Sequence, residues 1–462
     1  MVKEKTEVER TRNQGKIRRL VKKFSKMPDI NLKLFRDQVD HCLGNAKDAV
    51  FELTDAAIVT RSPESLAELS LSPIFRRQWH STYEALEDCN PSREKMMAIY
   101  TQQIALNQRP LLVGDHSAWF RPDAVTLKER TYEHKPSRIG VNRPIGIGFG
   151  YSTIAYVPEE LGSWTLPLLH ERINSSETAI SKLSEQLTQV CSQLDQRAIL
   201  LVDSQYGCAS FIQKTAEQPC DKLMRLSSNR CFWGEPMAYG GRGRPRKHGD
   251  KFKLNDSQTW HIEDEIEFVE HPRLGLLHLK AWHKLHFRQA ADQKLSLIRV
   301  EQSDSPKSKP LWLAWHGEQM PSLIEVVRLY LRRFTIEHWY RFAKQRLHWT
   351  LPNLGTKEQC DRWSDLMPMM SWELWLAREM MVDNPLPWQK PQINLTPGRV
   401  AQGFGIIIAM IGTPASAPKP RGKSPGWQKG KIRTKKLRYP LVKKGKGKFE
   451  SQKKEKKQKL SA

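Results

Sequence analysis

The chain has 462 residues, which predicts about two to four domains, and its 39% hydrophobic residues with 15 tryptophans exclude disorder throughout. Seven cysteines without a C-x-x-C pair argue against a disulfide framework and a structural zinc site, and no apolar run reaches the ~18 residues of a membrane span. The net charge of +25 favours a polyanion partner, although solubilising ends or attraction to a membrane surface would also explain it. The N-terminal residues do not form an apolar signal sequence, so we expect a cytoplasmic protein with no membrane anchor.

The first part of the chain, residues 1–106, is predicted to be a helical DNA-binding region. Residues 10–26 carry apolar side chains at helical spacing within a basic stretch, and a further helix is expected from Arg93 to Leu106.

Residues 107–229 are predicted to form an α/β core. A helix is expected from about Ser175 to Leu194, and short apolar runs on both sides of it predict buried strands. The predicted strands are 111–113, 145–157 (one or two strands) and 198–202. Strands that flank a helix at this distance indicate an α/β layer structure.

The second half begins with a predicted β-rich insertion at residues 230–317, where short alternating stretches replace helical periodicity. Helical periodicity then returns from Pro321 to about Trp349, and Thr396 is expected to cap a last helix that ends near Gly412. We therefore expect residues 318–414 to complete the core with C-terminal helices.

Residues 415–462, which are rich in Pro, Gly and Lys, are predicted to form a basic and largely disordered tail. The charge is concentrated at the two ends, because residues 419–462 carry +16 and residues 1–26 carry +7, which leaves +2 for the rest. We therefore expect the ends to supply affinity for a polyanion and to make that binding strongly dependent on salt.

Two of the predicted buried strands end in an aspartate, Asp115 after the first and Asp203 after the last. A carboxylate there is costly to bury unless it is hydrogen-bonded, paired or bound to a metal ion. The carboxyl ends of strands in open α/β sheets are also where ligands usually bind. Each aspartate could instead start a turn or cap the next helix.

The helix predicted around Glu337 carries a third acid. At about 100° per residue, Tyr330, Arg333 and Lys344 share a stripe of roughly 60° with Glu337, and Arg341 borders it. This face offers a carboxylate, three cations and a phenol. It could also be a solvated amphipathic face with i,i+4 ion pairs.

Four of these residues stand at the spacing Tyr-x2-Arg-x3-Glu-x6-Lys: Tyr330, Arg333, Glu337 and Lys344. This pattern resembles the Y-R-E-K signature of bacterial insertion-sequence transposases of the DDE class, and the region from Asp115 to about Trp349 resembles their catalytic domain. The resemblance implies an RNase-H-like fold with Asp115 on the first strand, Asp203 after the fourth and Glu337 on a helix nearby. The fold class expected is therefore α/β, with the β-rich insertion, helical N-terminus and basic tail added.

One residue departs from the family pattern. Many relatives have a second aspartate or a threonine after the first aspartate, whereas His116 follows Asp115 here. Asp123 is the nearest substitute, but it lies in a predicted loop, so we prefer Asp115. The histidines, including His116 and His338, lack metal-ligand spacing and are assigned no role.

The resemblance implies metal-dependent cleavage of DNA at the element ends and strand transfer into a target. Asp115, Asp203 and Glu337 would hold two Mg²⁺ ions, for which Mn²⁺ can substitute, because hard cations take carboxylate oxygens. Arg333, Lys344 and Arg341 would bind DNA phosphates, and Tyr330 would donate to a phosphate or pack the helix. The implied partners are double-stranded DNA and a second copy of the chain, in a bacterial, nucleoid-associated setting.

The predicted insertion also contains the segment R-G-R-P, which includes Arg242 and Arg244. It resembles the AT-hook, whose arginines enter the minor groove of A/T-rich DNA, and a basic Gly/Pro turn is the competing interpretation. Two alternatives to a transposase remain: an RNase-H-like nuclease without strand transfer, and a catalytically silent architectural DNA-binding protein.

Overall fold

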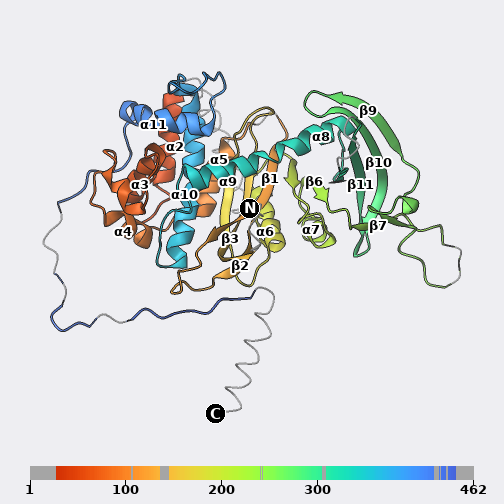
Figure 1. Ribbon diagram of the computed structural model, residues 1–462, viewed down its shortest axis with the longest axis horizontal. Helices are drawn as coiled ribbons and strands as arrows, with labels where there is room; N and C mark the ends of the chain where they lie inside the picture. The colour runs from red at the N-terminus through yellow and green to blue at the C-terminus, as the bar shows by residue number, and fades with distance from the viewer. Residues whose placement is uncertain are drawn as a thin grey trace, which may run out of the picture.

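The computed structural model describes residues 28–443 apart from 106–107, 136–144, 240, 242, 304–308, 421–425, 427 and 433–434. The helix predicted within 10–26 and the DNA-binding role predicted for Arg242 lie outside the described residues. Figure 1 shows a helical part at one end, a sheet in the middle and a β extension at the other end. Within the described residues, no helix combines the length and apolar character that a membrane span requires.

The described residues before β1 (Leu111–Phe120) are mostly helical. The helices are α2 (Pro28–Asp40), α3 (Lys47–Val59), α4 (Ser81–Asp88) and α5 (Arg93–Gln102), with a 3₁₀ turn at Leu66–Leu71. A buried Arg36 ties α2 to the rest, because its guanidinium bonds Asp55 on α3 and Glu373 on α10 (Lys357–Ala377). Helix α5 ends at Gln102, earlier than predicted.

The predicted α/β core is present. Its strands are β1 (Leu111–Phe120), β2 (Thr131–His134), β3 (Ile145–Tyr156), β4 (Leu166–Ile173), β5 (Ala198–Val202) and β6 (Cys220–Leu226). The central order is β4-β3-β1-β5-β6, in which β1, β5 and β6 are parallel and β3 is antiparallel to its neighbours. The short β2 pairs with the start of β3, on the same edge as β4.

Helix α6 (Ala179–Cys191) packs on the core sheet, and α7 (Ala209–Lys214) follows β5. Helix α6 begins later than Ser175, because Thr178 and Ser181 form a reciprocal capping box at its start.

Strands also follow β6 in the region predicted to be β-rich, and they continue the core sheet instead of forming a separate one. They are β7 (Cys231–Trp233), β8 (Lys251–Lys253), β9 (Glu265–His271), β10 (Gly275–Phe287), β11 (Ala290–Gln302) and β12 (Leu311–His316), with a 3₁₀ turn at Ser257–Thr259. Strand β12 pairs antiparallel with β6, which makes one sheet of twelve strands. Aromatic rings of Phe252, Trp260, Trp282 and Trp312 pack together in this extension.

The single long helix predicted after Pro321 is instead two helices, α8 (Leu323–Arg332) and α9 (Thr335–Gln345). A tightened turn separates them, because Arg333 N bonds Tyr330 O and Glu337 N bonds Phe334 O, each three residues back. Helix α10 and a 3₁₀ turn at Arg378–Met380 follow, and α11 (Pro397–Ile411) begins after Thr396 and ends before Gly412, as predicted.

The basic tail was predicted to lack structure, but one described segment is attached to the body. Tyr439 N donates to Val125 O and Val442 N donates to Arg130 O, both at 2.9 Å. Lys128 Nζ also lies 5.1 Å from the centre of the Tyr439 ring. Composition did not reveal this segment, because its attachment uses backbone groups that every residue carries.

Candidate active site

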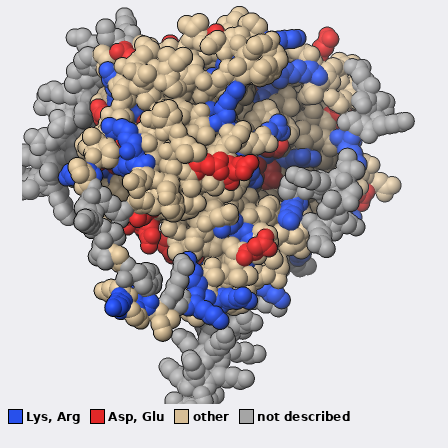
Figure 2. Space-filling view, turned by 60° about the vertical axis from the view of Figure 1, so that its left-hand side comes forward, with Lys and Arg blue, Asp and Glu red and all other residues tan. Residues whose placement is uncertain are grey.

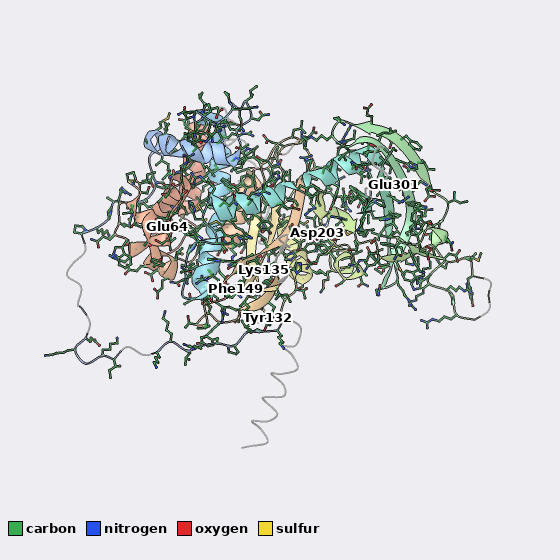
Figure 3. The ribbon with its side chains drawn as sticks, in the orientation of Figure 1. Glu64, Tyr132, Lys135, Phe149, Asp203 and Glu301 are labelled. Carbon is green, nitrogen blue, oxygen red and sulfur yellow. The ribbon has the colours of Figure 1, made fainter. Side chains whose placement is uncertain are left out.

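The sheet register brings the two predicted aspartates together. The last parallel pair between β1 and β5 is Gly114 with Val202, so Asp115 and Asp203 are the next residue along each strand. Strand β5 ends there as predicted, but β1 continues to Phe120 because β3 pairs with it from Leu112 onwards. Asp115 therefore lies inside a strand and not at its end, and Figure 3 places Asp203 near the middle of the molecule.

The Asp115 carboxylate is largely buried, with 14% of its side chain exposed. Burial raises the pKa of Asp115 to about 7, and the negative charge of Asp203 adds to this effect. Two contacts oppose the shift: Oδ1 accepts from His116 N at 2.7 Å, and Arg333 lies close. The pair of carboxylates thus favours a bound proton or cation.

A buried arginine connects the strand acid to the helix acid. Arg333 Nη1 contacts Asp115 Oδ2 at 3.4 Å, and Nη2 contacts Glu337 Oε1 at 2.5 Å. Glu337 stands in the first turn of α9 and is half exposed, whereas the guanidinium itself is buried. Asp115, which was predicted from the end of an apolar run, therefore shares one site with Arg333 and Glu337, which their helical spacing had grouped.

Asp203 also begins a turn, which was the other role open to it. Its Oδ1 accepts from Gln205 N at 3.0 Å, and Tyr206 N bonds Asp203 O. The two roles are compatible, because the turn holds the carboxylate at the end of β5 beside Asp115.

A hydrogen-bonded chain behind Asp115 was not found from the sequence. The Tyr340 hydroxyl donates to Asp115 O at 3.0 Å and hydrogen-bonds Thr153 Oγ1 at 2.8 Å. Thr153 Oγ1 in turn contacts His170 Nδ1 at 2.8 Å. Burial lowers the pKa of His170 to about 3, with the Lys344 charge second, so the ring is neutral. These three residues lie among buried apolar ones and show no sequence pattern of their own.

The remaining helix residues take different positions. Lys344 reaches β1, where its Nζ donates to Ser117 Oγ at 2.8 Å, and burial lowers the pKa of Lys344. Arg341 is exposed on α9. Tyr330 is 1% exposed and its ring packs near Arg333 and Phe334, which favours the packing role over a phosphate contact.

His116, which was assigned no role, touches the site. Its Nδ1 lies 3.7 Å from Asp115 Oδ1 and 3.4 Å from the buried Tyr206 hydroxyl. The sequence could have indicated this contact, because His116 directly follows Asp115 on β1. Metal-ligand motifs are recognised by the spacing between several ligands, so a single histidine beside an acid does not match one.

The donor set suits a hard cation, since Asp115 and Asp203 offer adjacent carboxylate oxygens. In the described part of the chain, however, no three His, Cys, Asp or Glu side chains are close enough together to hold a metal ion. In this structure Glu337 is paired with Arg333. Metal binding through all three acids would require Glu337 to leave Arg333.

Arg244 is exposed in the loop between β7 and β8, at the far end of the molecule from α11 (Figure 1). Gly241 precedes the R-G-R-P segment and Gly243 lies within it, with φ of +81° and +78°. The loop therefore turns at both glycines, and the structure is compatible with both roles considered for it.

Figure 2 shows lysine and arginine side chains spread over one face of the molecule around smaller groups of acidic ones.

Comparisons with known proteins include a family match and a weak structural similarity. The family model described as DDE superfamily endonuclease matches residues 38–289, more than half of the chain. A solved structure described as a piggyBac transposase synaptic complex with hairpin DNA is similar over 80% of this chain and 74% of that chain, with 8% identity and a TM-score of 0.39. No curated protein matches this chain.

Proposed function

The chain belongs to the DDE superfamily endonuclease family, and from this premise we propose that it is the DNA transposase of a bacterial insertion sequence. It would cleave phosphodiester bonds at the element ends and join them to target DNA. The observation that carries the proposal is the register of β1 with β5, which sets Asp115 beside Asp203, within reach of the arginine that holds Glu337. The strand order β4-β3-β1-β5-β6 supports an RNase-H-like core.

Asp115, Asp203 and Glu337 would hold two Mg²⁺ ions, or Mn²⁺ in their place, and the ions would activate the nucleophile and stabilise the leaving 3′ oxygen. The protein's own groups prepare this site. The Tyr340 hydroxyl fixes the backbone of Asp115, and Arg333 keeps Glu337 near it.

Arg333 has a second role in this proposal. Once Glu337 turns toward the aspartates, the guanidinium is free to take a phosphate oxygen, for which its planar fork is well shaped. Lys344 and Arg341 would contact phosphates as point charges, and Arg242 and Arg244 would contact DNA from the β7–β8 loop. The partners are thus double-stranded DNA and, because two ends are cut in concert, a second copy of the chain.

Amide replacements test the catalytic assignment. We expect Asp115→Asn, Asp203→Asn and Glu337→Gln each to abolish Mg²⁺-dependent cleavage of a supercoiled plasmid that carries the element ends, while DNA binding remains. Cleavage that survives all three replacements would overturn the assignment.

The same assay separates the alternatives. A nuclease without strand transfer would cleave the plasmid but give no joined products with target DNA. An architectural protein would bind DNA without metal-dependent cleavage, and the amide replacements would change nothing.

A further inference from the structure

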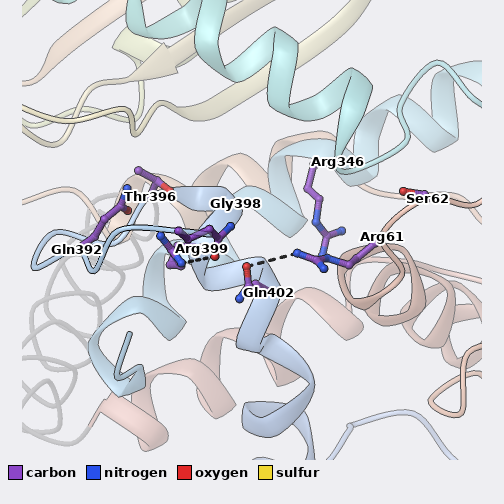
Figure 4. Close-up of a pocket in the computed structure, with 9 residues that line it drawn as sticks. Arg61, Ser62, Arg346, Gln392, Thr396, Gly398, Arg399 and Gln402 are labelled. Atoms are coloured by element: carbon purple, nitrogen blue, oxygen red, sulfur yellow. Dashed lines mark hydrogen bonds between the residues drawn. The ribbon is translucent and has the colours of Figure 1, made fainter. Parts of the chain in front are cut away.

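Two hollows lie next to each other on the helical side of the molecule. The first has a volume of about 470 Å³ and is shown in Figure 4. It is lined by Arg61, Ser62, Arg346, Gln389, Gln392, Thr396, Gly398, Arg399 and Gln402. The second, of about 400 Å³, shares Arg346, Thr396 and Gly398 with it. Because these residues line both, the hollows are adjacent, and the pair is called the α11 groove below.

Three arginines line the first hollow, and no aspartate or glutamate is among its lining residues. Arg346 gives its hydrogen bonds to the backbone carbonyls of Ala57, Ile58, Thr60 and Ala401. Burial, and then the charge of Arg61, lowers the pKa of Arg346 to about 10. Two guanidinium groups thus repel each other here, and in the described part of the chain neither forms an ion pair with a carboxylate.

The third arginine and the polar neighbours complete the wall. Arg399 Nε lies 3.3 Å from Asp383 Oδ1, while its Nη1 bonds Gln389 and its Nη2 donates to Lys390 O. Arg61 donates to Gln402 Oε1 at 3.5 Å. One neutralised and two unneutralised guanidinium groups leave the hollow with a positive charge that an anion would balance.

The backbone adds to this preference. The first turn of α11, a helix of 15 residues, opens into the groove at Thr396, Pro397 and Gly398. A helix N-terminus carries a partial positive charge and free N–H groups. A Cβ added to Gly398 would meet nothing within 4 Å, so the space in front of this turn is open.

The second hollow is lined in part by α9, the helix that carries Glu337. His338 and Arg341 are the polar residues of its first two turns that line the hollow. His338 is the residue after Glu337, and Arg341 is one helical turn, about 5 Å, further along the axis. The helix of the candidate catalytic glutamate therefore borders one hollow, and the three arginines border the other.

We propose that the α11 groove binds the phosphodiester backbone of the DNA next to the scissile bond, with a phosphate seated between Arg61, Arg346 and the start of α11. This inference rests on the proposed function for the identity of the ligand. It assigns DNA contact to residues that the sequence did not single out: Arg61, Arg346, Arg399 and Gly398.

The first test compares two variants of equal size. Gly398→Glu places a carboxylate in the groove, whereas Gly398→Gln adds the same atoms without the charge. Both replace a helical glycine in open space, so neither should lower the thermal midpoint. Binding of a labelled linear duplex is measured by anisotropy in EDTA, where cleavage cannot interfere. We expect the Glu variant to bind about tenfold more weakly than the Gln variant.

The second test removes a cation from the wall. We expect Arg61→Gln to weaken binding and to lower the slope of log affinity against log salt by about one. The matched control is Arg288→Gln, an exposed arginine between β10 and β11, which lie at the opposite end of the molecule from α11. The control should leave both quantities unchanged.

The outcomes separate the two proposals. If the paired variants bind alike and Arg61→Gln matches its control, the groove inference is overturned, while wild-type cleavage still decides the transposase. If wild type never cleaves but the groove variants weaken binding as expected, the groove stands and the proposed function falls. If wild type does not bind the duplex, both are overturned.

Discussion

Asp115 combines burial, a neighbouring carboxylate and an ion pair with Arg333. Its pKa of about 7, raised first by burial and then by Asp203, leaves the metal-free carboxyl partly protonated at neutral pH. A divalent cation that binds beside it must displace this proton, so metal binding and pH are coupled. The site therefore suits a bound cation, and without one the buried Asp115 carboxylate lowers the free energy of unfolding.

Replacing Asp115 by Asn should therefore stabilise the metal-free protein at high pH. Because the folded state raises this pKa, the stability that the protonated form contributes is complete below the unfolded value of about 3.9 and is lost as pH rises through about 7. In urea unfolding with EDTA, we expect Asp115→Asn to gain roughly 1–3 kcal/mol over wild type at pH 8 and nothing at pH 4. Asp123→Asn, in an exposed loop, is the control; equal effects of Asp115→Asn at both pH values would contradict the argument.

Tyr340→Phe should impair cleavage more than DNA binding. The change removes one oxygen and with it the hydrogen bonds to Asp115 O and Thr153 Oγ1, while the contact of Thr153 with His170 remains. We expect a loss of about 1–2 kcal/mol in the free energy of unfolding and a cleavage rate about tenfold lower, because Asp115 is held less firmly. Single-turnover cleavage and anisotropy separate the two effects. Tyr132→Phe, on an exposed strand, should leave both at the wild-type level.

Local sequence patterns predicted three residues that the structure brings together. The end of an apolar run indicated Asp115, and i,i+4 spacing on a helix indicated Arg333 and Glu337. Tyr340, Thr153 and His170 come from three elements and sit among aromatic rings. A polar residue in an apolar stretch is usually part of the packing, so only the assembled sheet and helix reveal this chain.

Among the elements, β1 and the α8–α9 pair depart most from expectation. An apolar run predicts where a strand is buried, but β1 continues past it because β3 remains as a partner. Likewise, the helical periodicity of the sequence continues through Arg333 and Phe334, because a single tightened turn hardly changes the direction of the side chains. The pattern therefore predicts one helix where the structure has two. Strand ends and single-turn breaks depend on hydrogen bonds to distant segments, which a local pattern does not contain.

The contact between β1 and α6 depends on Gly114, the residue before Asp115. A Cβ there would lie 2.7 Å from Leu183 Cδ2 on α6, well inside a normal contact. We expect Gly114→Ala to lower the free energy of unfolding by about 1–3 kcal/mol through overpacking. In a Leu183→Ala background most of this loss should disappear, which denaturant unfolding of the double-mutant cycle measures.

Gly405→Ala in α11 is the control for this cycle. Its Cβ would lie 3.7 Å from Val59 Cγ1, an ordinary contact, so helix propensity should make the change neutral or stabilising by up to about 1 kcal/mol. Additive effects of Gly114→Ala and Leu183→Ala would show that α6 does not rest on this glycine.

For the whole molecule, the net charge of +25 separates into a body with +2 and two basic ends. The body nevertheless holds local charge of both signs: carboxylates where β1 and β5 meet, and arginines in the α11 groove. Most of the affinity for DNA is therefore assigned to the two basic ends, and the chemistry is assigned to the carboxylates of the body. The attachment of Tyr439 and Val442 beside β2 brings Lys443 near the sheet.

Removing residues 444–462 tests this division while keeping the attached segment. The deletion takes away eight lysines and two glutamates, a net charge of +6. Each phosphate that a lysine no longer neutralises should lower the slope of log affinity against log salt by about 0.9. We expect weaker duplex binding, a flatter slope and an unchanged thermal midpoint. A full-length chain with these eight lysines replaced by glutamine should behave like the truncation, because charge and not length is responsible. A salt slope equal to that of wild type in both variants would place the phosphate contacts on the body, with the α11 groove as the first candidate.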